Sequence, residues 1–104
     1  MKTNLTKEES AHLIELGVPK EKASRRHIEL TLEEYRVFDL TDLLDILPKE
    51  IGSHSCISID WNFITEKWDV DYDCTQGSGY GAKELIDALY ELLCWVITNK
   101  YLKL

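Results

Sequence analysis

Cations, glycine and long apolar runs are scarce in this chain of 104 residues. It has 12 Lys and Arg against 19 Asp and Glu, which gives a formal net charge of −7. Nucleic acid and anionic membranes attract proteins that carry an excess of cations, so we expect neither as a partner. Residues 25–27, Arg-Arg-His, form a short basic cluster, but glutamates follow it closely.

The three cysteines, at positions 56, 74 and 94, are odd in number and form no Cys-x-x-Cys pair. This pattern is typical of reduced thiols in the cytoplasm and supplies no recognisable four-ligand zinc site. The start of the chain is polar, unlike the apolar core of a signal peptide. No apolar run approaches the ~20 residues of a membrane span. We therefore expect a cytoplasmic protein without a membrane segment.

The length and the hydrophobic content of 44% predict a single folded domain over residues 1–104. A chain of this size can bury one core without a metal or a disulfide. The sequence contains no internal repeat and no linker between domains.

A long amphipathic helix is predicted from Ala82 to Tyr101. Its apolar residues recur at the spacing of a buried stripe, and residues 92–97 are apolar without interruption, so most sides of its second half must be covered. We expect Leu89→Asp to unfold the protein. Trp95 lies beside the polar stripe, where we expect the N-terminal helix to cover it; the alternative is a tryptophan exposed to a partner.

A short helix is predicted near the N-terminus. Thr6 and Glu9 have the spacing of a capping box, which marks the start of a helix. Gly17 ends this helix, and Pro19 can begin one further turn.

One or two short strands and a second helix follow. Residues 25–38 alternate between polar and apolar side chains, which favours the strands. The helix is predicted from Thr41 to Leu47, with either Asp39 or Thr41 as its cap. Asp39 is favoured because Phe38, just before it, could then pack against Leu43.

The clearest strand pattern lies in Ser55–Cys74. Apolar residues alternate with polar ones on both sides of a turn at Phe63–Glu66. One hairpin register places all the apolar residues on a single face, by pairing Trp61 with Trp68, Ile59 with Val70, and Ile57 with Tyr72. The predicted fold is therefore α+β: a small antiparallel sheet of two to four strands packed against a long C-terminal helix and a short N-terminal helix.

This register gathers four aspartates, Asp60, Asp69, Asp71 and Asp73, on the outer face of the hairpin, with Asp60 directly opposite Asp69. Several carboxylates around one point are what Ca²⁺ or Mg²⁺ requires, so a cation site is one interpretation. The favoured interpretation is an ordinary solvated sheet face. A neighbouring strand with Arg25 or Arg26 could screen its charge.

Three glycines occur in Gln76–Gly81, directly before the C-terminal helix. A phosphate-binding loop is a poor match, because no second strand follows the helix and the Lys-Ser/Thr pair of a P-loop does not occur. We interpret this segment as a flexible link into the helix.

Two segments, Leu43–Ile51 and Asp87–Leu102, separated by a hairpin rich in Trp and Tyr, resemble a group of small uncharacterised proteins from phages, prophages and other mobile elements of bacteria. The resemblance extends over most of the chain. It implies an accessory role in a bacterial cytoplasm. It carries no activity, cofactor or catalytic residue.

No constellation of residues in the sequence indicates catalysis, so we predict that the protein is not an enzyme and holds no cofactor. The leading hypothesis is a small accessory protein-interaction module with an unknown protein partner, and a homodimer through the C-terminal helix is a further expectation. Two alternatives remain. One is a metal-binding protein or metal-dependent enzyme that uses Asp60, Asp69, Asp71 and Asp73, and the other is an acidic mimic of nucleic acid.

Overall fold

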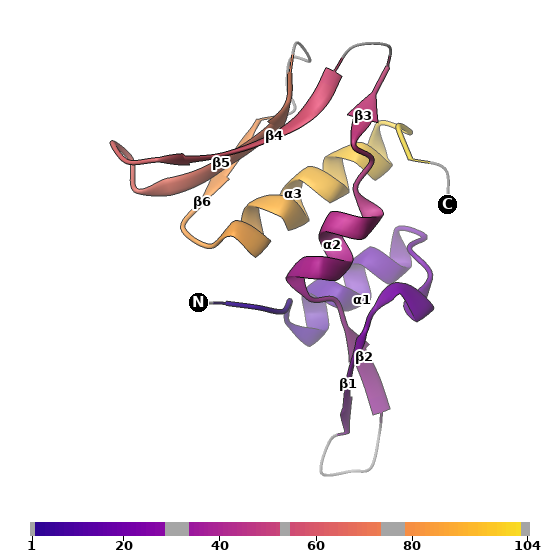
Figure 1. Ribbon diagram of the computed structural model, residues 1–104. Helices are drawn as coiled ribbons and strands as arrows, with labels where there is room; N and C mark the ends of the chain where they lie inside the picture. The colour runs from indigo at the N-terminus through magenta and orange to yellow at the C-terminus, as the bar shows by residue number, and fades with distance from the viewer. Residues whose placement is uncertain (1, 29–33, 53–54, 74–78, 103–104) are drawn as a thin grey trace.

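The computed structural model describes residues 2–28, 34–52, 55–73 and 79–102, without the side chains of residues 25–28 and 34. Three α-helices, a 3₁₀ turn and six strands follow one another along these parts of the chain (Figure 1). Their order is α1 (Lys7–Glu15), η1 (Lys20–Lys22), β1 (Arg25–Ile28), β2 (Glu34–Val37), α2 (Leu40–Ile46), β3 (Glu50–Ile51), β4 (Ser55–Asn62), β5 (Lys67–Tyr72), β6 (Tyr80–Ala82) and α3 (Leu85–Thr98).

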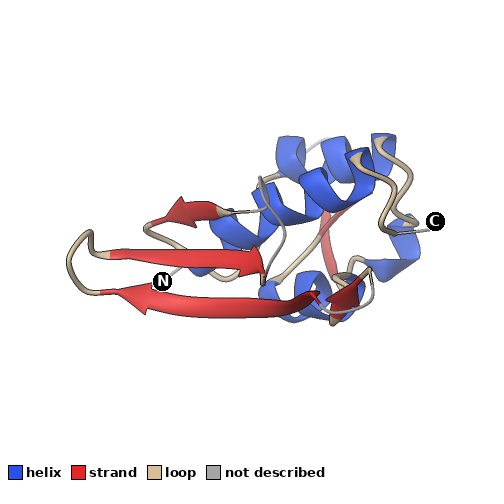
Figure 2. Ribbon diagram, turned by 90° about the horizontal axis from the view of Figure 1, so that it is seen from above, coloured by secondary structure: helices blue, strands red, loops and turns tan. Residues whose placement is uncertain are grey.

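The main sheet is antiparallel, with the strand order β3-β4-β5-β6. The helix α3 lies along one face of this sheet and separates it from α1 and α2 (Figure 1). Figure 2 shows the long β4–β5 hairpin extending beyond the helices at its turn. The predicted α+β architecture, with the sheet packed against a long C-terminal helix, is confirmed.

The hairpin register is the one that the alternation predicts. Trp61 pairs with Trp68, Ile59 with Val70, and Ile57 with Tyr72, around a turn at residues 63–66. The Tyr72 hydroxyl donates a hydrogen bond of 2.7 Å to the Pro48 carbonyl, which ties β5 to the segment after α2.

The predicted caps of the first two helices are confirmed, and α2 begins at Leu40, one residue before its predicted start. The Thr6 hydroxyl accepts a hydrogen bond from the Glu9 amide at 3.1 Å, and the Glu9 carboxylate accepts one from the Thr6 amide at 3.0 Å. The helix α2 is capped by Asp39, the earlier of the two candidates, which accepts from the Asp42 amide at 2.9 Å. Phe38 and Leu43 are both fully buried, as the favoured cap requires.

Two predictions about the chain before α3 are wrong. Residues 80–82, assigned to the flexible link and to the first turn of the helix, form the edge strand β6, and α3 begins only at Leu85. Gly81 lies opposite Asp69, and a Cβ atom at this position would be 2.9 Å from the Asp69 carboxylate. A side chain at position 81 would therefore displace the Asp69 carboxylate where β6 approaches β5. The rest of the link, residues 76–78, lies outside the described residues.

The suggestion that Arg25 or Arg26 screens the aspartates is also wrong. The strands β1 and β2 pair only with each other, in a separate two-stranded sheet on the far side of α3 (Figure 1). In the main sheet, β6 is the strand beside β5. The predicted strands themselves are confirmed at both ends of the 25–38 segment, while residues 29–33 lie outside the described part.

The helix α3 ends in a left-handed turn at Lys100, whose φ is 61°. The Tyr101 amide donates to the Val96 carbonyl and the Lys100 amide to the Ile97 carbonyl, the pattern of a Schellman motif. This turn brings Tyr101 back onto Trp95, with ring centroids 5.3 Å apart and nearly parallel. Trp95 is thus half-buried beneath the segment that follows α3. The sequence predicted either a cover by the N-terminal helix or exposure to a partner, and neither prediction included this contact.

The core lies between the sheet and the three helices. Six residues of α3 are fully buried, and α1, α2 and the sheet cover them from different sides. Within the described residues, no helix is both long and apolar enough to span a membrane. The buried set from α3 comprises Ile86, Ala88, Leu89, Leu92, Leu93 and Val96.

Candidate functional site

The inner face of the β4–β5 hairpin changes from buried to exposed along its length. At the covered end, Tyr72 and Val70 are each 1% exposed, beneath α3. Further along the same face, Trp68 is half-buried and Trp61 is 48% exposed. The hairpin continues past the start of α3, so its last apolar side chains have no helix above them (Figure 1).

The turn of this hairpin adds two further apolar side chains. Phe63 is 79% exposed and Ile64 is 80% exposed, although both are large and hydrophobic. Exposed apolar residues that stand alone are common on protein surfaces, whereas contiguous ones mark interaction sites. We refer to Trp61, Phe63, Ile64 and Trp68 together as the tip patch.

Local contacts hold the tip patch in a defined shape. The Asn62 side-chain oxygen accepts hydrogen bonds from the amides of Ile64 and Thr65, at 3.0 and 3.2 Å. This Asx turn constrains the loop, and Glu66 closes it with a φ of 54°. Across the strands, the Trp61 and Trp68 rings meet edge to face, with centroids 5.4 Å apart. Local contacts therefore preorganise the backbone of the turn and the two tryptophans.

The outer face carries the four aspartates, and Asp60 and Asp69 are direct cross-strand partners, as predicted. Partial burial raises the pKa of Asp71, and the charges of Asp73, Asp60 and Asp69 raise it further. The four carboxylates are therefore close enough to repel one another.

The aspartates bond to neighbouring side chains. The Ser58 hydroxyl donates to Asp60 at 2.9 Å, and the Asn62 amide group donates to Asp69 at 3.2 Å. All four aspartates belong to the described residues, and within those residues no group of three or more His, Cys, Asp or Glu side chains could hold a metal ion. The geometry gives the alternative interpretation, a cation site, no support.

The structure assembles one cluster that the sequence does not reveal. The His12 ring nitrogen Nδ1, on α1, lies 2.6 Å from the Tyr90 hydroxyl and 3.9 Å from the Cys94 sulfur, both on α3. About 80 residues separate His12 from the other two, so no local spacing indicates the contact.

This cluster lacks the chemistry of a nucleophilic site. Burial raises the pKa of the Cys94 thiol to about 11, and the charges of Glu91 and Glu9 add to the shift, against a hydrogen bond from Tyr90. The thiolate is the nucleophilic form of cysteine, and it is scarce at neutral pH when the pKa is this high. The cluster joins α1 to α3.

No family model, no curated protein and no solved structure matches the chain. The resemblance to proteins of phages and mobile elements therefore stays a prediction. The tip patch is the strongest candidate site on geometric grounds.

Proposed function

We propose that the protein is a non-catalytic interaction module, and that it binds a protein partner by inserting the tip patch into an apolar cleft with cations around its rim. The observation that carries this proposal is the pair of large side chains, Phe63 and Ile64, exposed at the end of a hairpin whose turn is hydrogen-bonded to Asn62. The predicted role as an accessory protein in a bacterial cytoplasm is compatible with such a partner.

The composition of the patch fits a binding hot spot. Tryptophan is enriched among the residues that contribute most to binding energy, and such residues cluster where a partner can exclude water. Trp61 and Trp68 already hold each other in place. Because Asn62 constrains the turn, little conformational entropy is lost when the patch is buried.

The surrounding charge defines the partner. Asp60 and Asp69 lie on the outer face of the strands that carry the patch, and the whole chain has a net charge of −7. Lys or Arg residues around the partner's cleft would meet these carboxylates and speed association. A second copy of this chain would bring the same negative charge to the interface. An anionic membrane would repel the protein for the same reason.

The predicted homodimer through the C-terminal helix is not part of this proposal. Six residues of α3 are already buried within the protein's own core. The aspartate face serves here as a charged border of the docking surface, since its carboxylates are arranged along two strands and bonded to Ser58 and Asn62.

The test is a capture experiment followed by affinity measurements on three matched proteins. They are the wild type, Phe63→Ser/Ile64→Ser at the tip, and Ile14→Ser, which removes an exposed apolar residue from α1. Loss of one hot spot costs at least ~2 kcal/mol, or about 30-fold in affinity. We expect the tip variant to lose at least this much and Ile14→Ser to bind the partner as the wild type does.

Three results would contradict the proposal. The tip variant and the wild type could bind the captured protein with equal affinity. The wild type could instead form a dimer through the tip. Sedimentation would then show a dimer for the wild type and a monomer for Phe63→Ser/Ile64→Ser. It could also bind neutral lipid vesicles in a tip-dependent way.

A further inference from the structure

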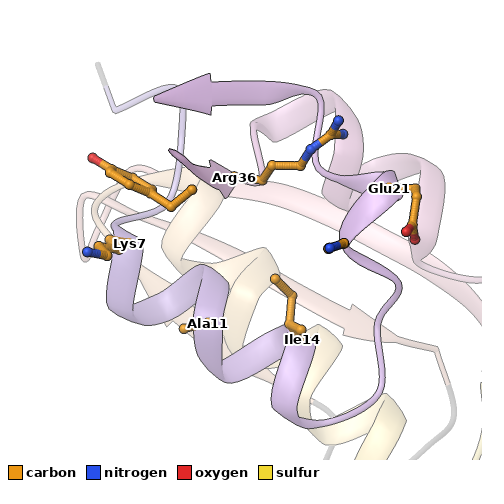
Figure 3. A pocket seen from close by; sticks show the side chains of 7 residues that line it. Lys7, Ala11, Ile14, Glu21 and Arg36 are labelled. Atoms are coloured by element: carbon orange, nitrogen blue, oxygen red, sulfur yellow. The ribbon is translucent and has the colours of Figure 1, made fainter. Parts of the chain in front are cut away.

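A pocket of about 470 Å³ lies on the far side of α3 from the main sheet, between α1, η1 and β2 (Figure 3). Its volume is within the range of ~300–1,000 Å³ that is typical of small-molecule sites. The tip patch belongs to the main sheet, so nothing in this pocket depends on the docking surface proposed above.

The wall of the pocket concentrates positive charge. Three cations, Lys7, Lys20 and Arg36, line it with one acid, Glu21, in a chain where acids outnumber cations by 19 to 12. The ion pairs among the described residues both belong to Lys2, and neither Lys20 nor Arg36 takes part in one. Within the described residues, no ion pair therefore neutralises Lys20 or Arg36, although Glu21 lies at the same opening.

Backbone contacts position Arg36 at the pocket. One guanidinium nitrogen donates to the Ala23 carbonyl at 3.2 Å, which anchors the side chain. A guanidinium has five N–H groups, so this one bond leaves further donors for a ligand. Arg36 and Lys20 come from different elements, β2 and η1, and both line the same opening.

The remaining wall is apolar. Ala11 and Ile14 project into the pocket from one face of α1, three residues apart, and Ile14 is exposed (Figure 3). Tyr35 contributes an aromatic ring, with the Lys7 ammonium 4.9 Å from its centre. A ligand here would meet both cations and hydrocarbon.

We propose that this pocket binds a small organic anion, in which a carboxylate or phosphate group is attached to an aromatic or aliphatic body. The acidic group contacts Lys20 and Arg36, because charge-assisted bonds to planar guanidinium and ammonium groups suit both acids. The body packs against Ala11, Ile14 and Tyr35. Glu21 at the same opening disfavours a polyanion, so nucleic acid is not the ligand.

The test uses amide chemical shifts of the full chain during titration with phenyl phosphate. Phenol and inorganic phosphate supply the body and the acidic group separately, and benzoate replaces phosphate by carboxylate. We expect phenyl phosphate or benzoate to shift the amides of Ala11, Ile14 and Tyr35 saturably. Each separate half should bind at least about tenfold more weakly, because it makes one of the two kinds of contact. Whichever of phenyl phosphate and benzoate binds more tightly indicates whether the ligand is a phosphate or a carboxylate.

Lys20→Gln has a closely matched control. Lys22→Gln removes the same charge from the same 3₁₀ turn, but Lys22 is exposed and does not line the pocket. We expect Lys20→Gln to weaken binding about tenfold and Lys22→Gln to leave it unchanged. Absence of saturable shifts with either aryl acid overturns the proposal. Equal weakening by both variants also overturns it, because it indicates general charge attraction.

Discussion

The two ends of the inner hairpin face have the same sequence pattern and opposite environments. At one end Val70 and Tyr72 are buried beneath α3, while at the other Trp61 is half exposed and the turn beyond it carries Phe63 and Ile64 in solvent. Apolar side chains alternate with polar ones throughout. The alternation therefore determines which face a side chain takes, and a separate feature determines whether that face is covered.

That separate feature is the extent of the helix. The 14 residues of α3 span ~21 Å, whereas the 8 residues of β4 alone span ~26 Å and the turn extends further. Because α3 starts only at Leu85, after β6 has paired with β5, the helix covers one end of the hairpin and leaves the other bare. Folding stability should therefore reside at the covered end and binding at the tip.

The largest effect is expected from a charge placed in the core, on the helix that covers this end of the hairpin. Leu89 on α3 is fully buried, so Leu89→Asp must bury an unpaired carboxylate or expose the core. That cost is comparable to the ~5–15 kcal/mol net stability of a domain, and we expect no cooperative thermal transition by circular dichroism. Ile64→Asp at the tip should melt like the wild type. A folded Leu89→Asp protein would contradict the separation of the two ends.

Removal of hydrocarbon from each end gives a smaller and more quantitative contrast. Val70→Ala deletes two buried methyl groups and leaves a small cavity, so it should lower the free energy of unfolding by about 2 kcal/mol. Ile64→Ala deletes more carbon from an exposed position and should change it by less than about 0.5 kcal/mol. Urea denaturation measures both, and similar losses would mean that the tip is packed in solution.

The covered end was largely predictable from the sequence. The pairing of Trp61, Ile59 and Ile57 with apolar partners follows from alternation, because a slip of one residue would exchange the two faces, together with a turn at residues 63–66. Asp39 was distinguishable from Thr41 as a cap because Phe38 and Leu43 then pack together. These are local rules, and each involves residues close in sequence or fixed by alternation.

The extent of the helix and the candidate sites were not predictable in the same way. Residues 80–82 have the composition of a link, and only pairing with β5 makes them a strand. Lys7, Lys20 and Arg36 meet at one pocket because η1 and β2 fold back over α1, and no spacing in the sequence indicates this. Similarly, the exposure of Phe63 and Ile64 depends on where α3 starts.

The smallest effect on stability is expected on the outer face of the same strands. Alternation places the aspartates on this face, where their negative charges lie close together. Asp71→Asn removes a carboxylate that partial burial and three aspartates disfavour, so it should raise the free energy of unfolding at neutral pH, by less than about 1 kcal/mol because solvent screens charges on an exposed face.

The pH dependence of this gain has a definite sign. The pKa of Asp71 is raised in the folded state, so the folded wild type gains stability as pH falls from neutral through that pKa, until the unfolded chain is also protonated below its ordinary value of 3.8. The advantage of Asp71→Asn should therefore shrink on acidification and also in high salt, which screens the repulsion. Glu50→Gln, on the exposed edge strand β3, should show no such trend. A gain for Asp71→Asn that is independent of pH and salt would indicate a cause other than charge repulsion across the hairpin.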